Sequence, residues 1–527
     1  MRKRFKRILS ALACLVLLTG CGSAGEETQQ GEIIPFTTEL SGKILQSSAA
    51  ADDVFSVNYD PDGDFNPIRA DNGTNMLLTS LMYDCVFNVD SDFSFYSNVV
   101  TNYTTEDNIW WEFTVDTTIP FTDGSTLTAQ DVAYSITRAQ QSSQYKGRLS
   151  AIYGCSALSE DRFAITAATA HSRLPVILNI PIIKYGTMGE DVPPGTGPYR
   201  LADSRDKLVL FERNPRSREM PVEEIYLKSY ADVAERISAF EASLLDVTPN
   251  DPTGIYSFGY GGSNETRTFD TTNLHYLGFN MSSDFFQNSL ARYAMNYVVD
   301  RDGVAELMNG CGVASALPLL PSSELYNAEY AAKFRFDLIK CAQFFEAAGI
   351  KDLDEDGVPE FLVTGIPVEI NLSFIVNNNN AVKLQTARRI TENLNAIGIH
   401  TTLHEMAWTD YFYCLYNGEY DMYYGEMRLT PDWNLTPLFS QNSEVNYARC
   451  RDENYAQYFA DYLAAGDDTR YDAYQQACQY VIENGGIVPI CFERQQMITH
   501  RGVVSGASPT QYSLFNRFNE WTIDLTY

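Results

Sequence analysis

The chain has few histidines and lacks the short motifs that mark common catalytic sites. Its 527 residues include five histidines, and we find no GxSxG nucleophile motif, no phosphate-binding P-loop and no CxxC pair. His400 and His404 are four residues apart, but the sequence IHTTLHEM alternates like a strand and lacks the HExxH motif of zinc proteases. We therefore assign no catalytic residue, no metal ligand and no cofactor.

Basic residues are scarce as well. The sequence has 38 Lys and Arg against 68 Asp and Glu, a formal net charge of -30. Such a body repels phosphate backbones and anionic lipid headgroups, which excludes nucleic acid as a partner. At about 100 to 200 residues per domain, the length predicts two to four domains.

No run of apolar residues is long enough to span a bilayer as a helix. A basic start followed by the eleven-residue apolar run Ile8–Leu18 is typical of a secretory signal peptide, which we place at 1–20. The run ends in LTGC, which resembles a bacterial lipobox, so we expect Cys21 to carry lipid. The alternative is an ordinary signal peptide followed by a chance cysteine.

Residues 21–50 are small and polar, and we interpret them as a flexible tether between the lipid and the folded protein. The expected location is the cell envelope, either lipid-anchored on the outer face of the cytoplasmic membrane or in the periplasmic space. Eight further cysteines follow, and an exported location permits disulfides whose pairing the sequence does not specify.

From Val54 onward, strand and helix patterns alternate, which predicts a mixed α/β fold. Trp110–Val115 alternates like a strand. Thr128 and Asp131 form a capping box that predicts a helix continuing to Ala139. A second helix is predicted from Ser289 to Met308, and the sequence PPGTGP at 193–198 predicts a crossing between domains.

Six sequence segments, taken together and in their order along the chain, resemble those of a known protein family. They are WWEFTVDTTIPFTDGSTLTAQDVAYSITRA (110–139), PPGTGPYRL (193–201), HYLGFN (275–280), ARYAMNYVVDRDGVAEL (291–307), NLNAIGIHTTLHEMAWTDYFYCLYNGEYDMYYG (393–425) and GGIVPICFER (485–494). Together they resemble family 5 extracellular solute-binding proteins, the dipeptide and oligopeptide receptors of ABC importers.

The resemblance implies an α/β fold with two lobes, like periplasmic binding proteins of the Venus-flytrap type (type II, cluster C), and an additional middle domain. Lobe I is expected at 51–68, 190–272 and 486–527, the additional domain at 69–189 and lobe III at 273–485. Such a protein traps a peptide or another small solute by hinge closure and delivers it to the permease subunits of an ABC importer. We expect a monomer that binds its solute without chemistry.

The resemblance also implies a ligand-binding carboxylate in lobe III. The matching position is Asp432, which would pair with the α-amino group of a bound peptide. The alternative is that Asp432 only caps the turn after Pro431. Arg428 would neutralise a carboxylate of the ligand, or would instead pair with Asp432 or Glu426.

Three aromatic residues are further candidates. Trp408 matches a family aromatic beside the ligand cleft, and its amphipathic ring suits packing against a peptide. Tyr424 is assigned to the site in the same way, and Tyr423 is its neighbour. For all three, packing in the core is the alternative.

Other functions remain open at this point. The same receptor fold would also suit an oligosaccharide, an amino-acid derivative or a chelated metal such as nickel. A secreted hydrolase or an adhesin-type lipoprotein without a transport role is the alternative from another class. The sequence Asp352–Gly357 copies the first half of an EF-hand loop, but Val363 stands where the bidentate Glu belongs. We interpret it as an Asp-rich turn and leave calcium binding open.

Overall fold

The computed structural model describes residues 54–525, apart from 206–207, 216, 231, 251–262 and 356. The predicted signal peptide, Cys21 and the tether lie outside these residues. Among the described residues, no helix combines the length and the apolar character needed to cross a membrane. The eight cysteines of the described chain are free thiols.

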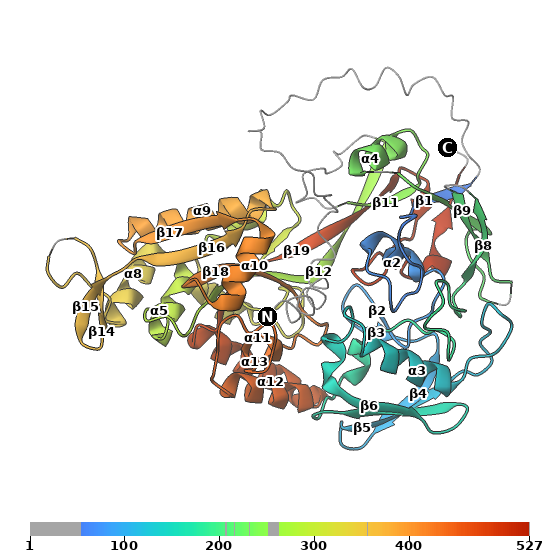
Figure 1. Cartoon of the computed structure of the whole chain (residues 1–527), viewed down its shortest axis with the longest axis horizontal. Helices are drawn as coiled ribbons and strands as arrows, with labels where there is room; N and C mark the ends of the chain where they lie inside the picture. The colour runs from blue at the N-terminus through green and yellow to red at the C-terminus, as the bar shows by residue number, and fades with distance from the viewer. Residues whose placement is uncertain are drawn as a thin grey trace, which may run out of the picture.

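One large sheet of eleven strands runs through the protein (Figure 1). Its strands, in order across the sheet, are β17 (Thr401–Met406), β16 (Leu372–Asn377), β18 (Met422–Arg428), β12 (Asn264–Phe279), β19 (Ile487–His500), β11 (Val247–Asn250), β1 (Phe55–Asn58), β10 (Glu224–Lys228), β9 (Leu208–Arg213) and β8 (Tyr199–Arg205), with β13 (Gly312–Ala314) paired to β19.

Two long strands in the middle of this sheet connect the two ends of the molecule. β12 and β19 pair antiparallel over most of their length, from Asn264 opposite His500 to Gly278 opposite Ile487. In Figure 1 they run between β16–β18 at the left and β1 with β8–β11 at the upper right. The chain therefore crosses between its two halves on paired strands.

A second, four-stranded sheet lies at the lower right of Figure 1 with helix α3 packed on it. Its order is β4 (Val100–Thr105), β5 (Trp110–Val115), β7 (Arg162–Ala167) and β6 (Ile152–Ala157). Three two-stranded pairs complete the strands of the described chain: β2 (Asn88–Val89) with β3 (Phe95–Tyr96), β14 (Glu360–Val363) with β15 (Ile366–Glu369), and β20 (Val504–Ser505) with β21 (Thr522–Ile523).

The α-helices are α2 (Gly73–Thr79), α3 (Ala129–Ala139), α4 (Val233–Glu241), α5 (Ser289–Ala294), α6 (Arg301–Leu307), α7 (Ala328–Ala331), α8 (Leu338–Ala347), α9 (Ala381–Ala396), α10 (Trp408–Asn417), α11 (Thr436–Phe439), α12 (Asn454–Ala464) and α13 (Asp467–Glu483). Short 3-10 helices are η1 (Arg148–Ala151), η2 (Leu174–Ile177), η3 (Met295–Tyr297), η4 (Ala332–Phe334) and η5 (Phe518–Glu520).

The predicted strand at Trp110–Val115 and the helix that follows it are confirmed. β5 has the predicted bounds, and α3 ends at Ala139. The carboxylate of Asp131 accepts hydrogen bonds from the backbone nitrogen of Thr128 at 2.8 Å and from its hydroxyl at 2.6 Å. This local contact explains why the start of α3 is readable from four residues of sequence.

The single helix predicted from Ser289 to Met308 is wrong. α5 ends at Ala294, a 3-10 turn follows, and the separate helix α6 begins at Arg301. The side chain of Asp300 accepts a hydrogen bond from the backbone nitrogen of Gly303 at 3.1 Å and so starts a new helix. The apolar spacing that suggested one helix belongs to two helices that share one core.

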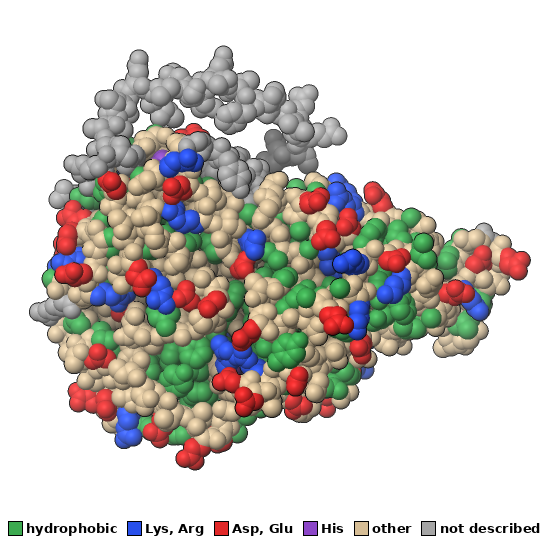
Figure 2. Space-filling model, turned by 180° about the vertical axis from the view of Figure 1, so that it is seen from behind, with side chains coloured by type: hydrophobic (Ala, Val, Ile, Leu, Met, Phe, Trp, Pro, Cys, Tyr) green, Lys and Arg blue, Asp and Glu red, His purple; other side chains and the backbone are tan. Residues whose placement is uncertain are grey.

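The buried apolar side chains form two main cores. One lies in the half that contains β16–β18, α5, α8–α10 and α13. The other joins β1 and β8–β11 to the four-stranded sheet and α3. The segment predicted as an additional domain thus shares its apolar core with lobe I. Figure 2 shows acidic side chains scattered over one face of the molecule, with fewer basic ones between them.

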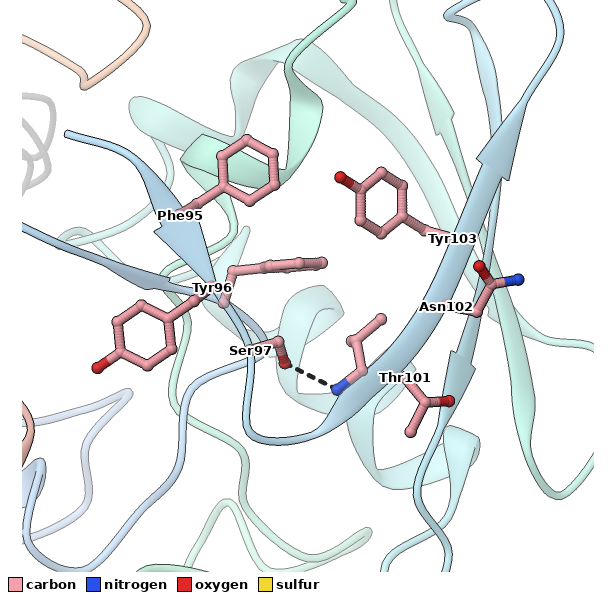
Figure 3. A pocket seen from close by; sticks show the side chains of 8 residues that line it. Phe95, Tyr96, Ser97, Thr101, Asn102 and Tyr103 are labelled. Carbon is pink, nitrogen blue, oxygen red and sulfur yellow. Dashed lines mark hydrogen bonds between the residues drawn. The ribbon is translucent and has the colours of Figure 1, made fainter. Parts of the chain in front are cut away.

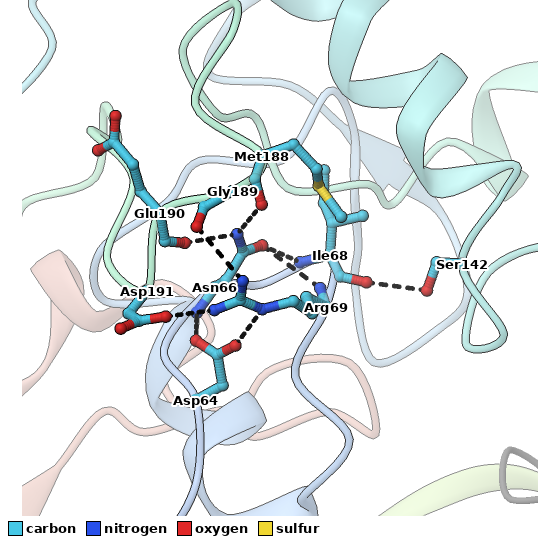
Figure 4. A network of polar contacts seen from close by, with 9 residues as sticks. All are labelled: Asp64, Asn66, Ile68, Arg69, Ser142, Met188, Gly189, Glu190 and Asp191. Atoms are coloured by element: carbon cyan, nitrogen blue, oxygen red, sulfur yellow. Dashed lines mark hydrogen bonds and ion pairs between the residues drawn. The ribbon is translucent and has the colours of Figure 1, made fainter.

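A polar network joins two chain segments that lie near the expected boundaries of the additional domain (Figure 4). The side-chain amide of Asn66 donates to the carbonyl oxygens of Met188 at 3.0 Å and Glu190 at 2.9 Å. The guanidinium of Arg69 pairs with Asp191 at 2.6 Å. These contacts hold the segments 66–69 and 188–191 together beside the boundaries proposed for the additional domain.

Candidate functional site

Three strands of the half that we call lobe III (273–485), β16, β17 and β18, run in one direction beside the crossing strand β12. β18 lies antiparallel to β12, with Met422 opposite Phe279 and Arg428 opposite Asn273. β16 is parallel to β18, and β17 is parallel to β16. Their carboxyl ends therefore lie where β12 passes from lobe III toward lobe I. In open α/β sheets, ligands bind at the carboxyl ends of strands.

Asp432 follows β18 at this place and is buried, with 6% of its side chain exposed. Its Oδ2 lies 3.0 Å from Nε2 of His171, whose side chain is 2% exposed. His171 belongs to the segment 69–189, which contains the four-stranded sheet, so the pair joins two parts of the chain. The predicted ligand carboxylate thus has a partner from the protein itself.

Asp432 also holds its own loop. Its Oδ1 accepts hydrogen bonds from the hydroxyl of Thr430 and from the backbone nitrogen of Asn434, the latter at 3.2 Å. Burial raises the pKa of Asp432, but the hydrogen bonds and the charge of His171 lower it by more, so its pKa lies below the ordinary value. The turn-capping alternative and a binding role are therefore compatible, because the two oxygens face different partners.

Arg428 is the last residue of β18. Its guanidinium donates to the carbonyl oxygen of Gln511 at 2.5 Å and lies 5.6 Å from the ring centre of Tyr512. Burial lowers the pKa of this guanidinium. Arg428 thus contacts the C-terminal segment, whereas Asp432 pairs with His171 and Glu426 with Lys383, so the described chain forms neither ion pair suggested for Arg428.

The predicted aromatic residues separate into exposed and buried positions. Trp408 begins α10, and 40% of it is exposed. Tyr423 and Tyr424 are buried in the lobe III core. The hydroxyl of Tyr424 lies 3.0 Å from Nδ1 of His275 on β12. Trp408 is therefore open to solvent, whereas Tyr424 contacts the crossing strand β12.

A second polar group at the carboxyl end of β18 was missed by sequence reasoning. Glu426 forms an ion pair with Lys383 in the first turn of α9. The side-chain amide of Asn273 donates to Glu426 at 2.7 Å and to Glu493 of β19 at 2.8 Å. Burial raises the pKa of Glu426, but Lys383, His275 and Asn273 outweigh it and lower its pKa to about 2.

No local sequence pattern predicts this second group, because its members come from three strands and a helix far apart in the chain. No local pattern predicted the contact of His171 with Asp432 either. The usable signals were the low number of histidines and the presence of His275 and Glu493 within two of the quoted phrases.

A surface hollow of about 450 Å³ lies elsewhere, on the segment 69–189 (Figure 3). Phe95 and Tyr103 flank it from β3 and β4. Between these strands, the hydroxyl oxygen of Ser97 accepts a hydrogen bond from the backbone nitrogen of Val100 at 2.7 Å. None of the four predicted ligand residues lines it. A smaller hollow of about 160 Å³ lies near Asp84, Arg218 and the C-terminal segment.

The order of the large sheet and the two apolar cores define a two-lobed α/β architecture. Residues 94–447, more than half of the chain, match the family of bacterial extracellular solute-binding proteins, family 5, and the chain belongs to this family. Its members bind peptides or other small solutes outside the cytoplasm and work with ABC permeases. The chain is a transport protein and not an enzyme.

Two solved structures have the same fold. The oligopeptide-binding protein AppA of Bacillus subtilis, in complex with a nonapeptide, has a TM-score of 0.66 at 16% identity and covers 89% of this chain and 98% of its own. NikZ of Campylobacter jejuni, in complex with Ni(L-His), has a TM-score of 0.68 at 16% identity, and the match covers 89% of this chain and 99% of NikZ. The two-lobed α/β fold implied by the sequence resemblance is confirmed.

One characterised relative matches over a shorter range. Heme-binding protein A of Haemophilus influenzae is 23% identical over 225 residues, which are 42% of this chain and 39% of that protein. The match thus spans less than half of the relative's length. The names of these three proteins give chemically different ligands, so similarity to them does not identify the solute that this chain binds.

Proposed function

We propose that the chain captures peptides between its lobes through Asp432 and delivers them to the permease of an ABC importer. The observation that carries this proposal is the contact between Asp432 of lobe III and His171 of the other half. A buried carboxylate whose partner comes from across the junction loses that partner when the junction opens. It is then free to accept another donor.

The α-amino group of a peptide is a suitable replacement for His171. A carboxylate removed from water forms strong charge-assisted hydrogen bonds with an ammonium group. The lowered pKa keeps Asp432 negatively charged at neutral pH. In the closed protein without peptide, His171 occupies the place of the ammonium group. With peptide, the ammonium group pairs with Asp432 and the lobes close around the peptide backbone.

Trp408 and Arg428 serve the same ligand in this proposal. Trp408 offers an exposed aromatic face at the start of α10, close in the fold to the carboxyl end of β17. Arg428 exchanges its contact with the carbonyl oxygen of Gln511 for a carboxylate of the peptide. Tyr424 acts less directly, because its hydroxyl contacts His275.

The proposal includes an anchor. Cys21 carries lipid, residues 21–50 form the tether, and the receptor works as a monomer on the outer face of the membrane. The match to an extracellular family supports an export signal at the N-terminus.

The first experiment identifies the bound solute. The full-length chain is purified in mild detergent, examined by native mass spectrometry, and denatured to release its ligand for sequencing. We expect peptides with free amino termini. If the chain is empty, di- to nonapeptides are screened by thermal shift, where a ligand at about 100 times its Kd adds roughly 2.7 kcal/mol of stability. A sugar, heme or metal chelate bound instead would refute the peptide assignment and leave the family intact.

A further inference from the structure

Three side chains with metal-binding atoms meet on neighbouring strands at the crossing between the lobes. His275 of β12 lies directly opposite Glu426 of β18, so both point to the same face of the sheet. Glu493 comes from β19 on the other side of β12. One ligand atom from each of these three residues lies within 4.8 Å of the other two. We call them the crossing triad.

The imidazole of His275 is oriented like a metal ligand. It is 1% exposed, and its Nδ1 lies 3.0 Å from the hydroxyl of Tyr424. Its Nε2 lies 3.5 Å from an oxygen of Glu493 and has no hydrogen-bond partner among the described residues. When Nδ1–H donates to Tyr424, the lone pair of Nε2 faces the two carboxylates. Histidines that bind metals are fixed in this manner by a contact to the other ring nitrogen.

The charges around the triad leave room for a cation. Glu426 and Glu493 bring two negative charges, and Lys383 brings one positive charge that contacts Glu426. Asn273 adds neutral donors, one amide group contacting both carboxylates. Two carboxylates against one ammonium group leave one negative charge uncompensated by these side chains. A metal ion beside Nε2 of His275 would compensate that charge.

We propose that the crossing triad binds a divalent transition-metal ion such as Zn²⁺ or Ni²⁺. The ligands are Nε2 of His275 and one oxygen each of Glu426 and Glu493. An imidazole with two carboxylates is a donor set that zinc accepts, and three protein ligands leave a position for water or for a donor atom of a solute. The ion would join β18, β12 and β19 where the chain passes between lobes. This site does not depend on a peptide as solute.

Lys383 sets the affinity of this site. Its ammonium group and the metal ion compete for the same carboxylate of Glu426. Removing the ammonium group therefore strengthens metal binding, whereas removing a ligand weakens it. A site formed only of surface carboxylates would not respond to Lys383 and His275 in opposite directions.

The test is calorimetric titration of the full-length, tag-free chain in mild detergent, stripped with EDTA, with ZnCl2 and separately with NiCl2. We expect saturable binding of one ion. His275→Gln and Glu493→Gln each weaken it at least tenfold, and Lys383→Met strengthens it at least threefold. His404→Ala, an exposed histidine outside the triad, leaves it unchanged. Asp352→Asn does the same, which separates the triad from the acidic group of Asp352, Asp354 and Glu360.

Several results would overturn the site. These are no saturable binding up to millimolar metal, an unchanged affinity in His275→Gln, or binding lost in Asp352→Asn. A calorimetric signal that comes only from protonation of the triad, without bound metal, also overturns the site. If the triad variants do not fold, X-ray absorption spectroscopy of the zinc-loaded wild-type chain identifies the ligand atoms of the ion. One imidazole with oxygen ligands supports the triad, whereas a sulfur ligand or the absence of imidazole scattering rules it out.

Discussion

Replacing the two members of the His171–Asp432 pair is expected to move peptide affinity in opposite directions. In Asp432→Ala, the ammonium group of a bound peptide lies in a dry place without its carboxylate. Hydrogen bonds to charged groups contribute about 1.5–3 kcal/mol, so Kd should rise roughly 10- to 150-fold. In His171→Ala, the peptide no longer competes with an internal donor, and a net hydrogen bond of about 0.5–1.5 kcal/mol predicts roughly 2- to 13-fold tighter binding.

The assay is isothermal titration with a peptide recovered from the chain or selected by thermal shift. The same peptide with an acetylated amino terminus is the matched control, because it keeps the side chains and loses the charge. Acetylation should weaken binding to the wild type and have little effect on Asp432→Ala. The reasoning is refuted if both variants weaken binding alike, which is the pattern of a purely structural pair, or if the wild type binds both peptides equally.

Three further changes test the anchor, the polar group and the packing. Cys21→Ala should release the protein from the membrane fraction on cell fractionation, and continued membrane association would contradict the lipobox interpretation. Because the pKa of Glu426 is lowered to about 2, the stability from its pair with Lys383 is present above its unfolded pKa of about 4.3 and is lost as pH falls toward 2. The difference in unfolding free energy between wild type and Lys383→Met should therefore shrink between about pH 5 and 2 in urea titrations, and a constant difference would exclude the ion pair as its source. In Gly278→Ala, the new methyl group would lie 2.1 Å from the ring of Tyr423, so urea unfolding should show a loss of about 1–3 kcal/mol, and an unchanged midpoint would refute this packing.

The parts of the fold that could be predicted from the sequence rest on local contacts or on a family pattern. The start of α3 follows from Thr128 and Asp131, which are three residues apart and bond to each other. The two-lobed architecture followed from the order of several phrases and not from any single one. The prediction of a single helix from Ser289 to Met308 was wrong because the spacing of apolar residues indicates which side chains are buried, not where a helix ends. Two short helices packed on one core show the same apolar spacing as one long helix.

The surroundings of the candidate site could not be predicted in this way. Asp432 was placed by resemblance, but its partner His171 lies 261 residues away in the sequence and reaches it only through the packing of the two halves. His275 and Glu493 meet because β12 and β19 are neighbours in the sheet. The sequence of neither strand indicates which strand it pairs with. Contacts between elements therefore depend on the sheet topology, which the spacing of residues along the sequence does not determine.

Two carboxylates at the carboxyl end of β18, the buried Asp432 and the partly buried Glu426, share one physical arrangement. Asp432 is paired with His171 and Glu426 with Lys383, and each partner comes from another element of the fold. Leaving the buried carboxylate of Asp432 unpaired would cost several kcal/mol of desolvation free energy, so His171 stabilises the contact between the two halves when no ligand is bound. Because the partners are present, a cationic ligand gains only the difference between its own contact and the internal one. Affinity at such a site is therefore set as much by the internal donors as by the carboxylates, and sequence changes at His171 and Lys383 should alter ligand preference without touching the ligand.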